Sequence, residues 1–131
     1  MARNNTVSAT FSQASGDGAS GFSESSGSAS FVSGDAIKIE GNVLHSGETQ
    51  YVLADYGIAQ ADGIYLENRD STNFISLSVR SGAGSGNNEA SLKIAPLGCF
   101  LVRMDDSQTA ITHIGIQADT APCNFILCCS E

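Results

Sequence analysis

Residues 63–79 alternate between hydrophobic and polar positions in two short runs that a polar segment separates. The sequence there is GIYLENRDSTNFISLSV. In the first run Ile64 and Leu66 occupy every second position, and in the second run Ile75, Leu77 and Val79 do so. A period of two places alternate residues on opposite faces of a β-strand. The segment between them consists almost entirely of turn-forming residues, so the pattern predicts a strand, a polar loop and a second strand.

Similar short alternations recur through the rest of the chain beyond residue 34, around residues 37–40, 92–94, 100–104, 114–116 and 123–129. Turn-forming segments separate them, and this spacing favours an antiparallel sandwich over alternating strands and helices. We therefore expect an all-β fold with little helix, in which residues 35–131 form a jelly-roll-like antiparallel β-sandwich. The alternation predicts a shared core that contains Ile75, Leu77, Leu92, Ile94, Phe100, Val102, Phe125 and Leu127.

Three segments depart from the alternating pattern. Gly41 and Asn42 are predicted to end the strand that contains Ile37. Residues 49–62 fit either one or two helical turns or an irregular strand. Residues 80–89 are polar and rich in glycine, which predicts a loop.

Residues 1–34 differ in composition from the rest of the chain. Serine, glycine and alanine dominate, and neither leucine nor isoleucine occurs. Such a bias is typical of a flexible arm, yet Val7 and Phe11 lie in one weakly alternating run and Phe31 lies in another. The sequence leaves two alternatives open for this segment: ordered edge strands, or an arm that becomes ordered on a partner.

The formal net charge of −8 on 131 residues narrows the range of partners. Nucleic acids and anionic membrane surfaces attract basic patches, so we expect neither as a partner. No apolar run reaches the ~18 residues of a membrane span, and the first residues lack the apolar segment of a secretory signal. We therefore expect a protein that folds in a cytoplasm.

The cysteines at positions 99, 123, 128 and 129 are the first candidates for metal or redox chemistry. A structural zinc site usually contains Cys-x-x-Cys pairs, whereas Cys128 and Cys129 are adjacent and lie on opposite faces of a strand. Disulfides are rare in a cytoplasm, so small buried thiols are expected. The sequence leaves the possibility of a disulfide between Cys99 and Cys123, because sequence spacing does not determine the distance between the two thiols.

The remaining motifs do not predict catalysis. His45 and His113 stand alone, and we expect His113 to be a hydrogen-bonded structural residue. The segment from Gly82 to Gly86 lacks the lysine and the helix of a phosphate loop. No Gly-x-Ser-x-Gly elbow occurs, and the acidic turns follow no calcium-loop pattern. We expect no enzymatic activity, no cofactor and no metal site.

Three stretches of the chain carry a resemblance: GIYLENRDSTNFISLSV, LKIAPLGCFLVRM and a final apolar strand. Together they resemble a group of small virion structural proteins of tailed bacteriophages. In that group a strand leads into an N-x-D-x-T-N turn, and an L-K-L-x-P-G-E turn leads into F-L-L-R. The first turn is matched here by Asn68, Asp70, Thr72 and Asn73. The second is matched by Leu92, Lys93, Ile94, Pro96 and Arg103, although Pro96-Leu97-Gly98-Cys99 replaces the Pro-Gly-Glu of the pattern.

The resemblance implies a structural protein of a tailed-bacteriophage virion that is assembled in the host cytoplasm. A capsid decoration or cement protein that stabilises the head shell is the first expectation. A tail or head–tail-joining component and a carbohydrate-binding sandwich module are the alternatives. The implied partners are the major capsid protein or other virion proteins, and decoration proteins favour a homotrimer. We expect subunit or shell contacts at Val7, Phe11, Phe22 and Phe31. We expect loop contacts at Asn68, Arg69, Asp70 and Asn73.

Overall fold

The computed structural model describes residues 3–13, 22–33, 35–104 and 109–131. The strands are β1 (Arg3–Gln13), β2 (Phe22–Ser33), β3 (Ala36–Val43), β4 (Thr49–Val52), β5 (Gly63–Asn68), β6 (Ile75–Arg80), β7 (Asn88–Ile94), β8 (Cys99–Arg103), β9 (His113–Ala118) and β10 (Cys123–Ser130). Short 3₁₀ turns occur at η1 (Leu53–Tyr56) and η2 (Ser85–Asn87).

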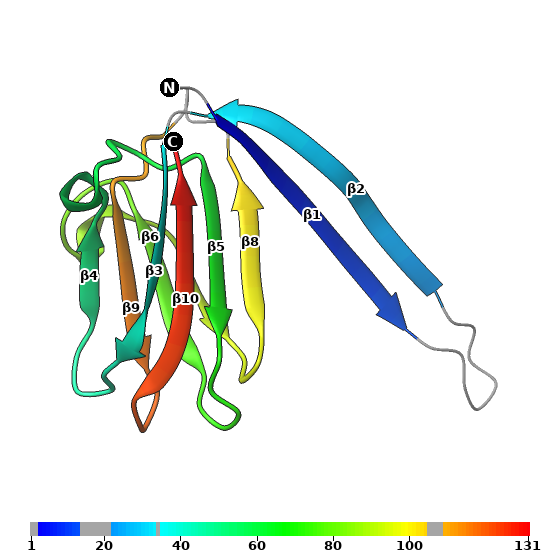
Figure 1. Cartoon of the computed structure of the whole chain (residues 1–131). Coiled ribbons are helices and arrows are strands. Elements are labelled where there is room, and N and C mark those ends of the chain that lie inside the picture. Colours follow the sequence, from blue (N-terminus) through cyan, green and yellow to red (C-terminus); the bar gives the residue numbers. More distant parts are fainter. Residues whose placement is uncertain (1–2, 14–21, 34, 105–108) are drawn as a thin grey trace.

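Strands β3 to β10 form two four-stranded antiparallel sheets, with the orders β3-β10-β5-β8 and β4-β9-β6-β7. Successive strands cross from one sheet to the other, except β6 and β7, which pair with each other (Figure 1). Eight strands in two sheets with these orders form a jelly roll. The all-β class and the antiparallel sandwich expected from the sequence are therefore confirmed.

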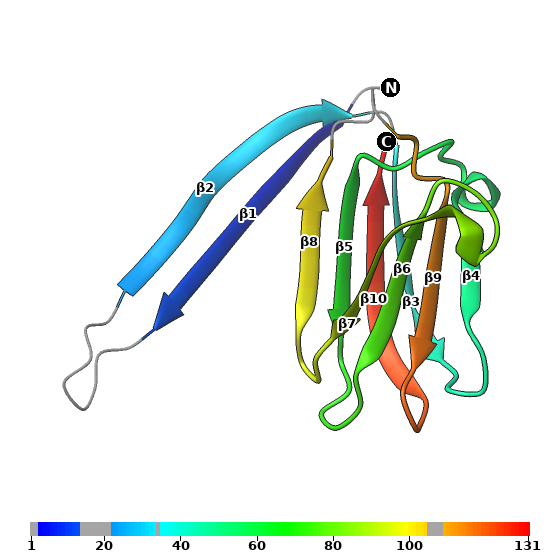
Figure 2. The ribbon, with the colours of Figure 1, turned by 180° about the vertical axis from the view of Figure 1, so that it is seen from behind.

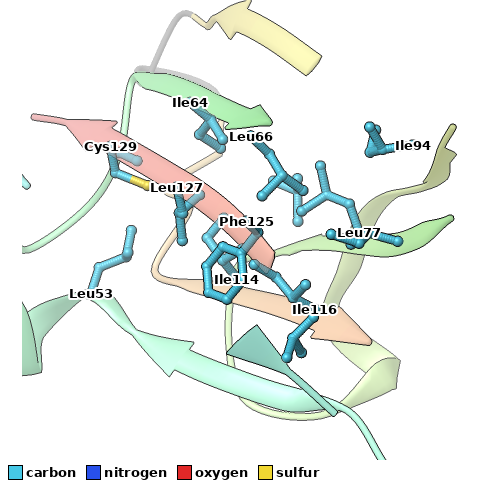
Figure 3. Close-up of a cluster of buried hydrophobic side chains, with 14 of the residues drawn as sticks. Leu53, Ile64, Leu66, Leu77, Ile94, Ile114, Ile116, Phe125, Leu127 and Cys129 are labelled. Carbon is cyan, nitrogen blue, oxygen red and sulfur yellow. The ribbon is translucent and has the colours of Figure 1, made fainter. Parts of the chain in front are cut away.

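Hydrophobic side chains from both sheets fill the space between them, as Figure 3 shows. The predicted core is confirmed: Ile75, Leu77, Ile94, Phe125 and Leu127 are buried, and Leu92, Phe100 and Val102 are partly buried against the same cluster. The ring of Phe125 lies 6.0 Å from that of Tyr51, measured between centroids, so an aromatic contact also joins the two sheets.

The prediction that Gly41 and Asn42 end a strand is wrong. Strand β3 continues to Val43, because Gly41 pairs with Phe125 and Asn42 pairs with Asn124 of β10. The Asn42 side chain also donates a hydrogen bond to the Asn124 amide oxygen at 3.1 Å. Pairing with a long neighbouring strand overrides the weak strand preference of these two residue types.

The ambiguous segment 49–62 and the predicted loop 80–89 both contain short regular elements. Residues 49–62 contain both of the structures that the sequence allowed, namely strand β4 and the 3₁₀ turn η1. The segment 80–89 closes through a hydrogen bond from the Ser81 amide to the Asn87 carbonyl at 3.1 Å. Turn η2 precedes β7, which starts within this segment.

Strands β1 and β2 pair antiparallel and form a two-stranded sheet of their own. Figures 1 and 2 show this hairpin beside the β8 edge of the sandwich and directed away from it. The N-terminal segment therefore contains strands, but they are not edge strands of the sandwich. The expected contact residues Val7, Phe11, Phe22 and Phe31 lie in this hairpin, and their side chains fall outside what the structure describes.

Candidate functional site

The outward face of the sheet β3-β10-β5-β8 carries hydrophobic residues where a solvated face would carry polar ones. On β10, Phe125 and Leu127 point into the core, so Ile126 and Cys128 belong to the opposite face. On β8, Leu101 alternates in the same way with Phe100 and Val102. We call Tyr65, Leu101, Ile126 and Cys128 the apolar strip. Ile126 is 6% exposed yet lies outside the core cluster.

The strand register places the residues of the apolar strip next to one another. Cys128 pairs with Tyr65, and Tyr65 pairs with Leu101, so these three form one row across β10, β5 and β8. Ile126 lies in the next row on the same face, beside Glu67. Residues in such rows are close enough for their side chains to interact. The strip is therefore continuous along the sheet, with Tyr65, Leu101 and Cys128 partly exposed and Ile126 almost covered.

Charged side chains of both signs border the apolar strip. Lys38 lies 2.6 Å from Glu40 on the β3 side, and Arg69 lies 3.2 Å from Glu67 on the β5 side. The Tyr65 hydroxyl donates a hydrogen bond to the Glu67 carboxylate at 2.8 Å. This bond is the main cause that raises the pKa of Tyr65 to about 12, and it lowers the pKa of Glu67. These exposed pairs add little stability, but they define a polar rim.

A groove of about 500 Å³ lies at the end of this face where β5 ends. It is lined by Glu40, Gly41, Asn42, Arg69, Asn124 and Phe125. The lining offers a carboxylate, two amides and a guanidinium around a small apolar floor. Such a set can hydrogen-bond a polar ligand or a polar segment of another protein.

The predicted loop contacts at residues 68–73 have different roles. Asn68 is fully buried, and its amide nitrogen donates to the carbonyls of Asn73, Ile94 and Ala95 at 2.8, 3.2 and 3.1 Å. The Asp70 carboxylate accepts the backbone amide of Asn73, a bond that lowers the pKa of Asp70. These residues build the loop, which leaves Arg69 as the exposed predicted contact that also lines the groove.

The structure also places the cysteines and His113. All four cysteines are free thiols. The expectation of buried thiols is confirmed for Cys123 and Cys129, whereas Cys128 is partly buried, and it is wrong for Cys99, which is exposed. Burial raises the pKa of Cys129 to about 12. Among the described residues, no group of three or more His, Cys, Asp or Glu side chains could hold a metal ion. His113 Nδ1 lies 2.7 Å from the Thr112 hydroxyl, as expected of a structural histidine.

The sequence analysis missed a polar network on the outward face of the other sheet. Arg80 is 4% exposed, and its guanidinium binds both carboxylate oxygens of Glu48 as well as the side-chain oxygens of Gln50 and Asn88. Gly115 leaves space for the Glu48 carboxylate, because a Cβ at position 115 would lie 2.6 Å from the Glu48 carboxyl carbon. The signal in the sequence is a charged residue that directly follows the apolar alternation of β6. Within the described ranges every buried side-chain nitrogen and oxygen has a hydrogen-bond partner, so this network stabilises the fold without an external ligand.

Comparisons with protein families, with curated proteins and with solved structures found no match for the chain. In the part of the chain that the structure describes, no helix is long and apolar enough to span a membrane. The class that the fold defines is the jelly roll, which serves virus capsids, lectins and cupin enzymes alike. A fold of this kind does not determine a function, so the function is argued from the surfaces.

Proposed function

We propose that this protein is a structural subunit of a tailed-bacteriophage particle, and specifically a decoration protein that binds the capsid as a homotrimer. The observation that carries the proposal is the arrangement of a complete jelly roll with a separate two-stranded hairpin. Among the residues whose burial the structure describes, the two four-stranded sheets cover each other's hydrophobic faces, and β1 and β2 form a sheet of their own. A hairpin that the sandwich does not need for its own core is available for contact with a neighbouring protein.

The two turns that resemble the virion proteins support the proposal, because they lie against each other. The Leu97 amide donates to the Asp70 carbonyl at 2.9 Å, and the Asn68 amide donates to the Gly98 carbonyl at 2.9 Å. The Asn68 side chain adds bonds to the carbonyls of Ile94 and Ala95. The two motifs are therefore one structural unit, and a shared fold would explain why both occur together in the resembled group.

The interior of the sandwich favours a structural role over a cupin-like enzyme. The described core consists of aliphatic side chains, Phe125 and two thiols. A metal-dependent active site in the same fold would need ligands such as histidine in place of some of these residues.

The test is mass spectrometry of purified particles of the virus that encodes this chain, followed by cryo-EM of the intact particle. We expect the chain in a fixed ratio to the major capsid protein and ordered density on the head. Copies confined to the tail or neck would replace the decoration role with the alternative of a tail or joining component. Absence of the chain from washed particles would reject a virion role.

One observation favours a second candidate, a carbohydrate-binding module. The groove beside Arg69 presents planar amide, carboxylate and guanidinium groups, which are suitable partners for sugar hydroxyls. A glycan array with the purified chain tests it, and Arg69→Ala should abolish any binding. Lys93→Ala is the matched control, because this exposed cation lies over the Phe74 ring and is not among the residues that line the groove. Equal binding by both variants would rule out the groove as the site.

A further inference from the structure

The register of the hairpin β1–β2 assigns its larger hydrophobic residues, apart from Val32, to one face, which also carries the polar residues Arg3, Asn5, Gln13, Glu24 and Ser33. The odd-numbered residues of β1, which include Val7 and Phe11, share a face. Phe31 pairs with Asn5, and Phe22 pairs with Gln13, on the two sides of a register shift between Ser8 and Thr10. Because this shift adds one residue to β2, the pairing assigns both phenylalanines to that same face. The residues assigned to the opposite face are mostly polar: Asn4, Thr6, Ser8, Thr10, Ser12, Ser23, Ser25, Ser28, Ser30 and Val32. The four expected contact residues therefore lie together on one side of the hairpin.

An amphipathic two-stranded hairpin is an incomplete element. Such a hairpin is only marginally stable in water, because it needs a third strand or a packed face. Figures 1 and 2 show that the hairpin overlies neither sheet of its own sandwich. The hairpin is therefore available to a surface on another molecule.

The apolar strip of Tyr65, Leu101, Ile126 and Cys128 is a second incomplete surface in the same chain. A sheet face that presents hydrophobic residues within a charged rim is typical of a protein contact. The hairpin and the strip could thus cover each other if they came from two different molecules. A second copy of the chain provides both surfaces.

Charge favours the hairpin over a second sandwich as the cover for the strip. The charged residues among positions 1–34 are Arg3, Asp17 and Glu24, whereas the rest of the net charge of −8 belongs to residues 35–131. Two sandwiches placed face to face would repel each other. The hairpin brings almost no net charge, and Arg3 and Glu24 lie near opposite ends of its hydrophobic face. They can meet the rim, which contains both signs at Lys38, Glu40, Glu67 and Arg69.

We propose that the hairpin of one copy lies across the apolar strip of a neighbouring copy, with the face of Val7, Phe11, Phe22 and Phe31 against the sheet. Each copy both donates a hairpin and receives one. Continued around an axis, this exchange produces a closed ring. The inference rests on the self-association in the proposed function and names its contact surfaces. The test of this contact uses the isolated chain in solution. The contact can therefore be disproved while binding to the virus particle is confirmed, and binding to the particle can be disproved while the contact is confirmed.

Native cysteines allow a direct test, because Cys99 and Cys128 belong to the outward sheet face that the hairpin would cover. Val7→Cys places a thiol on the hydrophobic face of the hairpin, and Ser8→Cys places one on the opposite face. Under mild oxidation we expect Val7→Cys to form disulfides between chains on a non-reducing gel. Ser8→Cys is the matched control and should form far fewer.

The identity of the linked thiols decides the outcome. The links of Val7→Cys should disappear when Cys99→Ser and Cys128→Ser are added. Links that persist in that background would arise between two hairpins and would overturn the proposal. Links within one chain, equal linking by Ser8→Cys, or no linking would overturn it as well.

A second measurement does not depend on cysteine chemistry. Leu101→Arg puts a charge into the apolar strip and should weaken self-association by about tenfold or more in sedimentation equilibrium. Ser91→Arg is the control, because Ser91 is an exposed position of β7 in the other sheet. Unchanged association of Leu101→Arg, or a wild-type chain that is monomeric at every concentration tested, would contradict the proposal.

Discussion

Position 77 and position 76 are adjacent in sequence, yet their side chains meet different environments. Leu77 is 1% exposed within the core, whereas Ser76 belongs to the outward face of β6. Leu77→Ala should lower the free energy of unfolding by about 2–5 kcal/mol, because it removes buried methyl groups and leaves a cavity. Ser76→Ala should change it by no more than about 0.5 kcal/mol. Urea unfolding measures both, and equal losses would show that the assignment of faces is wrong.

Arg80 is buried with its charge, so its partner Glu48 matters more than an ordinary surface carboxylate. Glu48→Ala leaves the guanidinium with the Gln50 and Asn88 side chains and should cost about 1–3 kcal/mol, since the Glu48 side chain is itself 32% exposed. Arg80→Met should cost less, because it also removes the buried charge. Glu89→Ala, at an exposed carboxylate bonded to Ser81, is the control. A larger loss in Arg80→Met than in Glu48→Ala would contradict this account.

Tyr65 should make stability depend on pH in the alkaline range. Its pKa is about 12 in the folded protein, mainly because its hydroxyl donates to Glu67, against about 10 in an unfolded chain. The folded state holds this proton more tightly, so the stabilisation is fully present below pH ~10 and is lost as the pH rises towards about 12.

Absorbance of the phenolate group measures the titration directly. In Glu67→Gln the pKa of Tyr65 should fall towards the ordinary value, and the alkaline loss of stability should become smaller. The same titration curve in both proteins would show that Glu67 does not cause the shift.

At the scale of elements, the turn between β7 and β8 contains unusual backbone. Leu97 has a φ of 58° and is 71% exposed, and a non-glycine residue in this region costs about 1–2 kcal/mol. In the resembled virion pattern a glycine follows the proline, which is the position that Leu97 occupies after Pro96. Glycine adopts the conformation found at position 97 without the steric cost that Leu97 carries.

Leu97→Gly should therefore stabilise the protein by about 0.5–1 kcal/mol, because the left-handed conformation carries no steric cost for glycine. Gly98→Ala should destabilise it, since a Cβ at that position would lie 2.9 Å from the Ala95 carbonyl oxygen. Thermal unfolding of the two variants should shift in opposite directions. A loss of stability in Leu97→Gly would argue that the Leu97 side chain makes a contact that outweighs the strain.

The strands and their buried faces could be predicted from the sequence because alternation is a local signal. Ile75, Leu77 and Val79 identify a face regardless of what that face meets. The sheet that each strand joins could not be predicted in this way, since β5 and β6 follow each other in the chain yet lie in different sheets. The partners of Arg80 could not be predicted from local sequence either, because Glu48 lies 32 residues away from Arg80. The end of β3 was misplaced for a related reason, since its length depends on β10.

At the scale of the whole molecule, the sandwich should fold without the hairpin. Its two sheets are formed by pairs among β3 to β10, and the described hydrophobic core residues all belong to positions 43–129. Deletion of residues 2–34 should leave a cooperatively unfolding domain that no longer self-associates. Light scattering and urea unfolding of the truncated chain measure the two properties. Self-association equal to that of the full chain would contradict the prediction, as would loss of cooperative unfolding.

The pairing of β3 with β10 also constrains when the protein can fold during its synthesis. Ala36 pairs with Ser130 and Val43 pairs with Cys123. Strand β3, the first of the sandwich, therefore cannot pair until β10, the last, has been synthesised. Contacts between such distant residues form slowly, because a long loop must close first. Until β10 has left the ribosome, β5 lacks a neighbour on one side and the core stays open. The nascent chain therefore exposes unpaired strand edges until β10 is synthesised, and chaperones would protect it during that interval.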